Sequence, residues 1–278
     1  MKKIVITFLF CILGITGCEK KKEPEFKAPM GPYGLPYQVG NLGGKPVLLG
    51  EESAWLEYED SPVLRPENRH WWYKAPPRTF DSVITSFGVE MKYTTGLIFI
   101  AYHAGPKESR EQYYAERDLL NNDWVTIGVN SGIRYHPDLT ALFINSTLGK
   151  NVRSKENIIN TDYVYIYIPT YTKEFGLEKY IPHPEWEKNY GYEDTNDMYI
   201  QKDSKGKVIT YIQCKNLPID NPARSCFMIW NLEPFMKVRL QVYFARKHLE
   251  DWKIIRERSE KLIKSFVVNP RTLKRSIP

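Results

Sequence analysis

The stretch DMYIQKDSKGKVITYIQC, residues 197–214, decides the fold. Its two arms, DMYIQ (197–201) and VITYIQC (208–214), are rich in the β-branched and aromatic side chains that favour strands. Between them, DSKGK is a turn sequence that places Gly206 where a positive φ is needed. The stretch therefore predicts a β-hairpin, and an antiparallel sheet around it.

The segments after this hairpin predict two further strands and a closing helix. Residues 226–230 and 237–245 (KVRLQVYFA) follow a loop rich in Pro and Asn and have strand composition. Residues 248–267 then carry a repeating set of buried-type side chains at steps of three and four, namely Leu249, Trp252, Ile255, Ser259, Leu262, Ile263 and Phe266. This spacing predicts an amphipathic helix that packs on the sheet and ends before Pro270.

The middle of the chain predicts more strands than helices. Strand patterns cover 82–93 (with a bulge at Gly88), 96–102, 123–129, 140–146 and 163–168, while 107–120 has helical spacing. Residues 173–195 are irregular and charged and predict a long surface loop. Together these elements predict an α+β fold, with antiparallel strands and helices on one face. Strands followed by a helix occur twice, which allows two half-domains that divide near residue 150.

The N-terminus has the three-part pattern of a secretory signal. Lys2 and Lys3 precede an uncharged apolar run, 4–15, and the small residues Thr16 and Gly17 follow it. A membrane-spanning helix needs about 20 apolar residues, so this run is too short to remain as one. The alternative is a buried strand or core helix. We expect residues 1–17 to be removed as a signal peptide.

Residues 15–18, ITGC, resemble the bacterial lipobox, with Ile15 where Leu is usual. The resemblance implies cleavage before Cys18, diacylglycerol on its sulfur and acylation of the new amino group, which gives stable membrane attachment. Glu19 stands where enterobacterial lipoproteins retained at the inner membrane have Asp, so the resemblance implies the outer membrane, facing the periplasm. Residues 18–46 are charged, then rich in Gly and Pro, and predict a flexible tether before a folded part at 47–278.

Two cysteines remain after the signal and the lipidated residue are set aside. Cys214 and Cys226 allow one intramolecular pairing, and an oxidising compartment favours a disulfide. The alternatives are a metal pair or a catalytic thiol, and no His stands nearby at ligand spacing. We therefore expect a disulfide.

The sequence contains no motif that assigns a catalytic residue, metal ion or cofactor. None of its five His residues lies in HExxH or a close His pair, and GVNSG (128–132) lacks the centred serine of GxSxG. His136 and His183 each stand two residues before a carboxylate at a Pro-containing turn, which is typical of caps. The net charge of +6 is spread along the chain and gives no reason to expect nucleic acid.

The most unusual cluster is HWWYK, residues 70–74. Trp71, Trp72 and Tyr73 lie between basic residues and could stack on sugars or anchor a protein interface. The alternative is a strand whose rings divide between core and surface.

The order of segments from 197–214 through Cys226 to the closing helix resembles small bacterial lipoproteins found beside type VI secretion effector genes and taken to be immunity proteins. Tyr243 and Trp252 match, and residues 81–93 resemble that group's upstream strand. The resemblance implies a membrane-anchored, non-enzymatic protein whose partner is a periplasm-acting effector. Two other functions remain open: an envelope maintenance or assembly lipoprotein, and a glycan or lipid hydrolase with a site built from distant residues.

Overall fold

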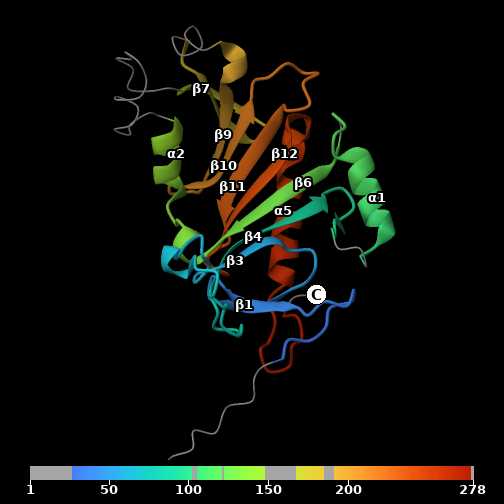
Figure 1. The fold of residues 1–278 in the computed structure, drawn as a ribbon. Coiled ribbons are helices and arrows are strands. Elements are labelled where there is room, and N and C mark those ends of the chain that lie inside the picture. The colour runs from blue at the N-terminus through green and yellow to red at the C-terminus, as the bar shows by residue number, and fades with distance from the viewer. Residues whose placement is uncertain (1–26, 102–104, 121, 148–166, 185–190, 277–278) are drawn as a thin grey trace, which may run out of the picture.

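A computed structural model describes residues 27–101, 105–120, 122–147, 167–184 and 191–276. Ten strands form one twisted antiparallel sheet, and a separate hairpin lies at one end of it (Figure 1). The strands of the large sheet are β3 (Ala54–Tyr58), β4 (Ile84–Lys92), β5 (Leu97–Ile98), β6 (Trp124–Asn130), β7 (Tyr167–Glu174), β8 (Leu177–Pro182), β9 (Asn196–Lys202), β10 (Val208–Lys215), β11 (Ser225–Asn231) and β12 (Arg239–Ala245). Their order is β3-β4-β6-β12-β11-β10-β9-β8-β7, with β5 beside β4.

The hairpin predicted at 197–214 is confirmed as β9 and β10. Its turn is closed by Asp203, whose Oδ1 accepts hydrogen bonds from the backbone N–H groups of Lys205 and Lys207, both at 2.9 Å. Gly206 has a φ of 80°, as the turn requires. Strands β11 and β12 continue the antiparallel order, so the α+β class expected from the sequence is confirmed.

One face of the sheet is covered by the C-terminal helix. A 3-10 turn, η4 (Arg246–Asp251), leads into α5 (Trp252–Ser265), which lies behind the sheet in Figure 1. Trp252, Ile255 and Ile263 of this helix are buried in the main core with the strand residues Trp230 and Leu240. Full burial of an aliphatic side chain contributes roughly 1.5–3 kcal/mol, so the apolar stripe read from the sequence holds the helix in place.

Helices lie on both faces of the sheet, whereas the sequence predicted one. The strand predicted at 140–146 is wrong, because these residues belong to helix α2 (Leu139–Thr147). Asp138 Oδ1 accepts a hydrogen bond from the Ala141 N–H at 3.0 Å, as a helix-capping residue does. Leu139 and Phe143, four residues apart, pack with Ile229 on the face opposite to α5. Helix α1 (Lys107–Glu116) is confirmed and ends four residues before the predicted limit.

The folded part begins before residue 47, the expected end of the tether. Strands β1 (Gln38–Leu42) and β2 (Lys45–Leu49) form the separate hairpin, which Gly43 and Gly44 close with positive φ angles of 56° and 93°. Leu42, Val47 and Leu49 belong to the main core. The apolar residues around this turn therefore build structure, although Gly and Pro punctuate the segment.

Two loop predictions also differ from the structure. The surface loop predicted at 173–195 is wrong in its first part, because β7 and β8 form a hairpin that turns at Gly176, with a φ of 81°. The pairing of β4 with β6 is continuous from residue 86 to 92, and the irregularity near Gly88 lies on the other side of β4, where residues 54–57 of β3 pair with residues 86–88 across a register shift. Most of the strand predicted at 163–168 lies outside the described residues. No helix in the described part of the chain is long and apolar enough to cross a bilayer.

Candidate functional site

The two cysteines expected to pair are joined in the structure. Cys214 and Cys226 lie directly opposite each other on β10 and β11, with Cα atoms 4.0 Å apart, and form a disulfide. Both are buried. Cys18, the predicted lipidation site, lies outside the described residues together with the whole predicted signal peptide.

Residues 66–78, named here the aromatic loop, connect β3 to β4 and hold the HWWYK cluster outside any strand. The loop opens with a 3-10 turn, η1 (Pro66–Asn68), so the alternative of a strand with divided rings is wrong. Trp71 is 91% exposed and Trp72 is 60% exposed. The ring of His70 stacks on Trp72 with centroids 4.4 Å apart, and Trp71 meets Trp72 edge-on at 5.6 Å.

Asp60 holds the base of the aromatic loop. Its Oδ2 accepts a hydrogen bond from the Tyr73 hydroxyl at 2.8 Å, and its two oxygens accept from Arg78 at 2.8 and 3.0 Å. Burial alone would raise the pKa of Asp60, but the hydrogen bonds from Tyr73 and Arg78 outweigh it and hold the pKa below its usual value. The Arg78 guanidinium also lies 4.0 Å from the Tyr58 ring centre.

The three aromatic residues singled out in the sequence therefore have two different places. The Tyr73 hydroxyl is hydrogen-bonded to Asp60, whereas the side chains of Trp71 and Trp72 are exposed to solvent. Arg69 and Lys74, both exposed, flank the two Trp residues in the sequence, and Arg69 Nε donates a hydrogen bond to the Pro62 carbonyl at 2.9 Å. Exposed rings beside cations form a surface suited to contact with another macromolecule.

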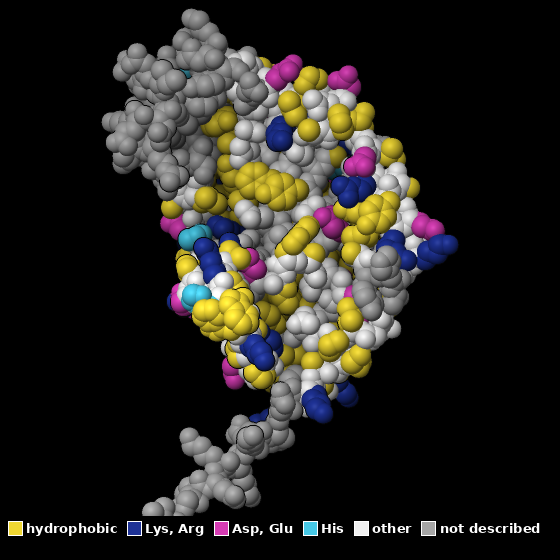
Figure 2. Space-filling model, in the orientation of Figure 1, with side chains coloured by type: hydrophobic (Ala, Val, Ile, Leu, Met, Phe, Trp, Pro, Cys, Tyr) yellow, Lys and Arg dark blue, Asp and Glu magenta, His cyan; other side chains and the backbone are white. Residues whose placement is uncertain are grey.

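A second surface lies on the sheet face opposite to α5. We name it the open row, because strand register brings five side chains into one line across five neighbouring strands: Gln213, Phe227, Tyr243, Thr126 and Glu90. The rings of Phe227 and Tyr243 stack at 5.7 Å, and Tyr243 is 49% exposed. Helices α2 and α1 stand on either side of this face in Figure 1, and Figure 2 shows hydrophobic side chains exposed across it.

Glu90 ends the open row with an unusual carboxylate. Burial raises its pKa from 4.5 to about 7, against the lowering effects of the Thr126 hydrogen bond and the Arg117 charge. Thr126 Oγ1 lies 3.0 Å from both carboxylate oxygens. In the described part of the chain, no ion pair involves Glu90 within 4.0 Å. A half-buried acid with no cation at ion-pair distance is a candidate contact for a charged ligand.

Two residues before Glu90 on β4 and two residues after Thr126 on β6, the sheet carries glycines and so has no side chains. Gly88 and Gly128 stand opposite each other on β4 and β6. Trp55, which has a φ of 53°, lies over Gly88, where a Cβ atom would come within 3.0 Å of its ring. Gly88 was predicted as a bulge; the register shift lies opposite it on β3, beside Trp55, and Gly88 makes room for the indole ring. Trp55 thereby extends the apolar surface beside the open row.

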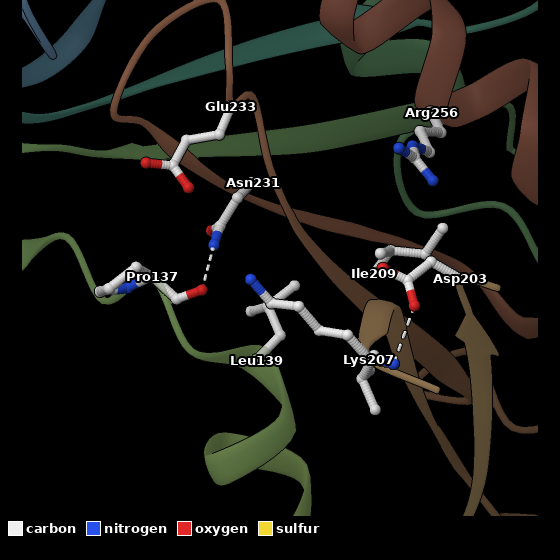
Figure 3. Close-up of a pocket in the computed structure, with 9 residues that line it drawn as sticks. Pro137, Leu139, Asp203, Lys207, Ile209, Asn231, Glu233 and Arg256 are labelled. Atoms are coloured by element: carbon white, nitrogen blue, oxygen red, sulfur yellow. Dashed lines mark hydrogen bonds between the residues drawn. The ribbon is translucent and has the colours of Figure 1, made fainter. Parts of the chain in front are cut away.

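The pocket in Figure 3 has a volume of about 240 Å³ and lies between α2, the β9–β10 turn and the loop after β11. Its polar groups are largely engaged in the fold. Asn231 Nδ2 donates to the Pro137 carbonyl at 3.0 Å, and Arg256 donates to Thr210 Oγ1 at 2.7 Å. Figure 3 shows Glu233 and Asp203 on different sides of the pocket. No Ser, Cys or His lines it, so the lining contains no Ser–His or Cys–His pair.

His248 belongs to a polar cluster for which the sequence gives no signal. Its Nδ1 lies 3.0 Å from the Tyr93 hydroxyl, which donates to Asp251 Oδ2 at 2.6 Å, and its Nε2 lies 3.0 Å from the Asn122 carbonyl. Burial lowers the pKa of His248, despite the opposing effect of Asn122. The cluster fastens the end of β4 to η4. Among the described residues, no group of three His, Cys, Asp or Glu side chains is placed to hold a metal ion.

No protein-family model and no curated protein matches this chain. Two solved structures align with most of this chain. Smlt3025, named as an immunity protein of the Stenotrophomonas maltophilia type IV secretion system, is 14% identical, with a TM-score of 0.47 over 88% of this chain and 100% of that one. FrpD, named as an iron-regulated outer membrane lipoprotein of Neisseria meningitidis, is 13% identical, with a TM-score of 0.38 over 87% of this chain and 97% of that one. At these values neither protein's role transfers to this chain.

Proposed function

We propose that this protein is a lipid-anchored binding protein of the cell envelope that neutralises a periplasm-acting secreted effector. The observation that carries the proposal is the aromatic loop, which presents Trp71 and Trp72 to solvent on a fixed base. Large exposed rings do not stabilise the isolated fold, since their apolar surface remains in water. They are, however, the side chains that most often dominate protein interfaces once a partner covers them.

The arrangement suits a rigid interface. Binding a partner costs less free energy when the contacting side chains are already ordered. Asp60 supplies this order by holding Tyr73 and Arg78, and the ring stack of His70 on Trp72 adds to it. The lipobox at 15–18 supports the same role, because a lipid on Cys18 would keep the protein at the membrane where an incoming effector arrives.

The proposal is tested in the producing bacterium with the full-length chain. Deleting the gene should cause growth arrest that depends on the secretion apparatus, and the detergent-solubilised protein should retain one dominant product of an adjacent gene. Trp71→Ala and Trp72→Ala should each weaken that binding at least tenfold and reduce protection, because each truncation removes a large anchor.

The matched control is Tyr171→Ala, which truncates another exposed ring, 94% exposed, on β7. It should bind and protect as the wild type does. Normal growth of the deletion strain, together with no binding to any neighbouring gene product, would refute the proposal. Recovery of several abundant envelope proteins in place of one partner would favour an assembly role.

A further inference from the structure

The open row has the composition of a recognition site for one kind of side chain. After Gln213 come the stacked rings of Phe227 and Tyr243, and the row ends at the Glu90 carboxylate, with Thr126 between Tyr243 and Glu90. Rings followed by a single carboxylate match a Lys or Arg side chain. Its methylene groups pack on the rings while its charged end meets the carboxylate.

The groups that face Glu90 leave its charge without a close partner. From β6, Thr126 donates a hydrogen bond, and from β12 the open row contributes Tyr243 beside Thr126. From the α1 side come Tyr113 and Arg117, and Arg117 lies 3.3 Å from Asp118.

The cation nearest along the same strand is also engaged. Lys92 lies two residues from Glu90 on the same face of β4, and its Nζ is 2.9 Å from Glu116 Oε2. Glu116 further accepts a hydrogen bond from the Trp124 indole at 3.0 Å. Gln112 Nε2 also donates to Glu116 Oε1, at 2.9 Å. Lys92 is therefore paired with Glu116 and is not the counter-ion of Glu90.

A partner that covers this face must supply the cation that the ionised Glu90 carboxylate lacks. A partner that lay on Phe227 and Tyr243 would remove the remaining water from Glu90, and a buried carboxylate is strongly unfavourable unless it is paired or protonated. An acidic partner surface is therefore disfavoured by charge, and a purely apolar one requires Glu90 to be protonated. We infer that the open row is a docking site for a protein segment that places a Lys or Arg side chain against Glu90 and an apolar residue on Phe227 and Tyr243.

This inference rests on the proposed function in one respect, namely that the partner is a protein, and it names the chemistry of the contacting segment. The probe is a display library of random ten-residue peptides, selected on the full-length chain in lipid nanodiscs. The same selection is run on Glu90→Gln, which keeps the size of the side chain and an acceptor for Thr126, and on the control Glu257→Gln, an exposed acid on α5.

The wild type and Glu257→Gln should enrich peptides in which Lys or Arg stands next to an aromatic or aliphatic residue, and Glu90→Gln should not. A selected peptide should bind at least tenfold more weakly to Glu90→Gln and to Tyr243→Ala. Its affinity for the wild type should rise by up to about tenfold from pH 6 to pH 8, as a carboxylate with a pKa near 7 ionises, and this rise should vanish in Glu90→Gln.

The inference is overturned by enriched peptides without a cation, by no enrichment that separates the wild type from Glu90→Gln, or by equal affinities of the two for a selected peptide. Because the peptides do not depend on any effector, these outcomes leave the test of the aromatic loop untouched. Conversely, a deletion strain that shows no intoxication would refute the role in neutralising an effector. It would not bear on the binding of Lys or Arg side chains at the open row.

Discussion

Replacing Glu90 by Gln should make the isolated protein more stable at neutral and alkaline pH. Burial raises the pKa of this carboxyl from 4.5 to about 7 in the folded protein. Ionising Glu90 in the folded protein therefore costs about 3 kcal/mol more than ionising it in the unfolded chain. Gln carries no charge and retains an oxygen for the Thr126 hydrogen bond, so the variant avoids this cost.

The pH dependence gives the direction of the effect. Between about pH 4.5 and pH 7 the folded protein keeps a proton that the unfolded chain has lost, so the wild type loses stability as pH rises through this window. The free energies of unfolding of the wild type and Glu90→Gln should agree near pH 4.5. At pH 8 the variant should be more stable by up to about 3 kcal/mol.

The measurement is urea unfolding of both proteins, with the disulfide intact, at pH 5, 6, 7 and 8. Glu257→Gln, an exposed acid, is the control and should differ from the wild type by less than about 0.5 kcal/mol throughout. A difference that does not grow with pH, or a Glu90→Gln protein less stable than the wild type at pH 8, would refute the reasoning. Gained stability together with lost peptide binding is the pattern expected of a residue kept for function.

Three further predictions concern other parts of the molecule. Replacing Cys214 and Cys226 together by Ala should lower the free energy of unfolding in urea by about 3 kcal/mol, from the chain entropy of a loop with a sequence separation of 12, and a loss below about 1 kcal/mol would contradict this account. Asp60→Asn should weaken the hold on Arg78 and speed amide hydrogen exchange throughout the aromatic loop without changing exchange in β10 and β11; unchanged exchange in the loop would show that Asp60 does not order it. His248→Asn should reduce the loss in free energy of unfolding that the wild type shows as pH falls below about 6.5. Burial lowers the pKa of His248, so only the unfolded wild-type chain takes up this proton as pH falls below about 6.5, and the wild type should lose stability there relative to the variant. Parallel curves for the two proteins between pH 6.5 and 5 would count against this role.

The C-terminal part of the fold could be predicted from sequence because its signals are local. The turn at Asp203 and Gly206 uses side-chain and backbone preferences that act within five residues. The spacing of Trp252, Ile255 and Ile263 predicts helix α5, and all three side chains are buried as expected. Helix α2 was missed because residues 140–146 contain both strand-forming and apolar residues, and the deciding contacts are the Asp138 cap and the packing of Phe143.

The candidate surfaces could be predicted only in part. The HWWYK cluster stands out in the sequence because its rings are adjacent, and the structure adds that Trp71 and Trp72 are exposed. The open row has no such signal. Glu90 and Phe227 share one line only because strand register joins β4, β6, β12 and β11, and no spacing along the chain encodes that register.

The position of β12 in the sheet has a consequence for when the protein can fold. Thr126 on β6 pairs with Tyr243 on β12, so the centre of the sheet joins two segments that lie far apart along the chain. Contacts between distant segments form slowly, because a long loop must close before they contribute. While β12 is still being synthesised, β6 has only β4 of its two neighbours, and the β3–β4–β6 part of the sheet is not joined to the strands beyond β12. If residues 1–17 act as the predicted export signal, this topology favours translocation of an unfolded chain, with the sheet completed on the far side of the membrane.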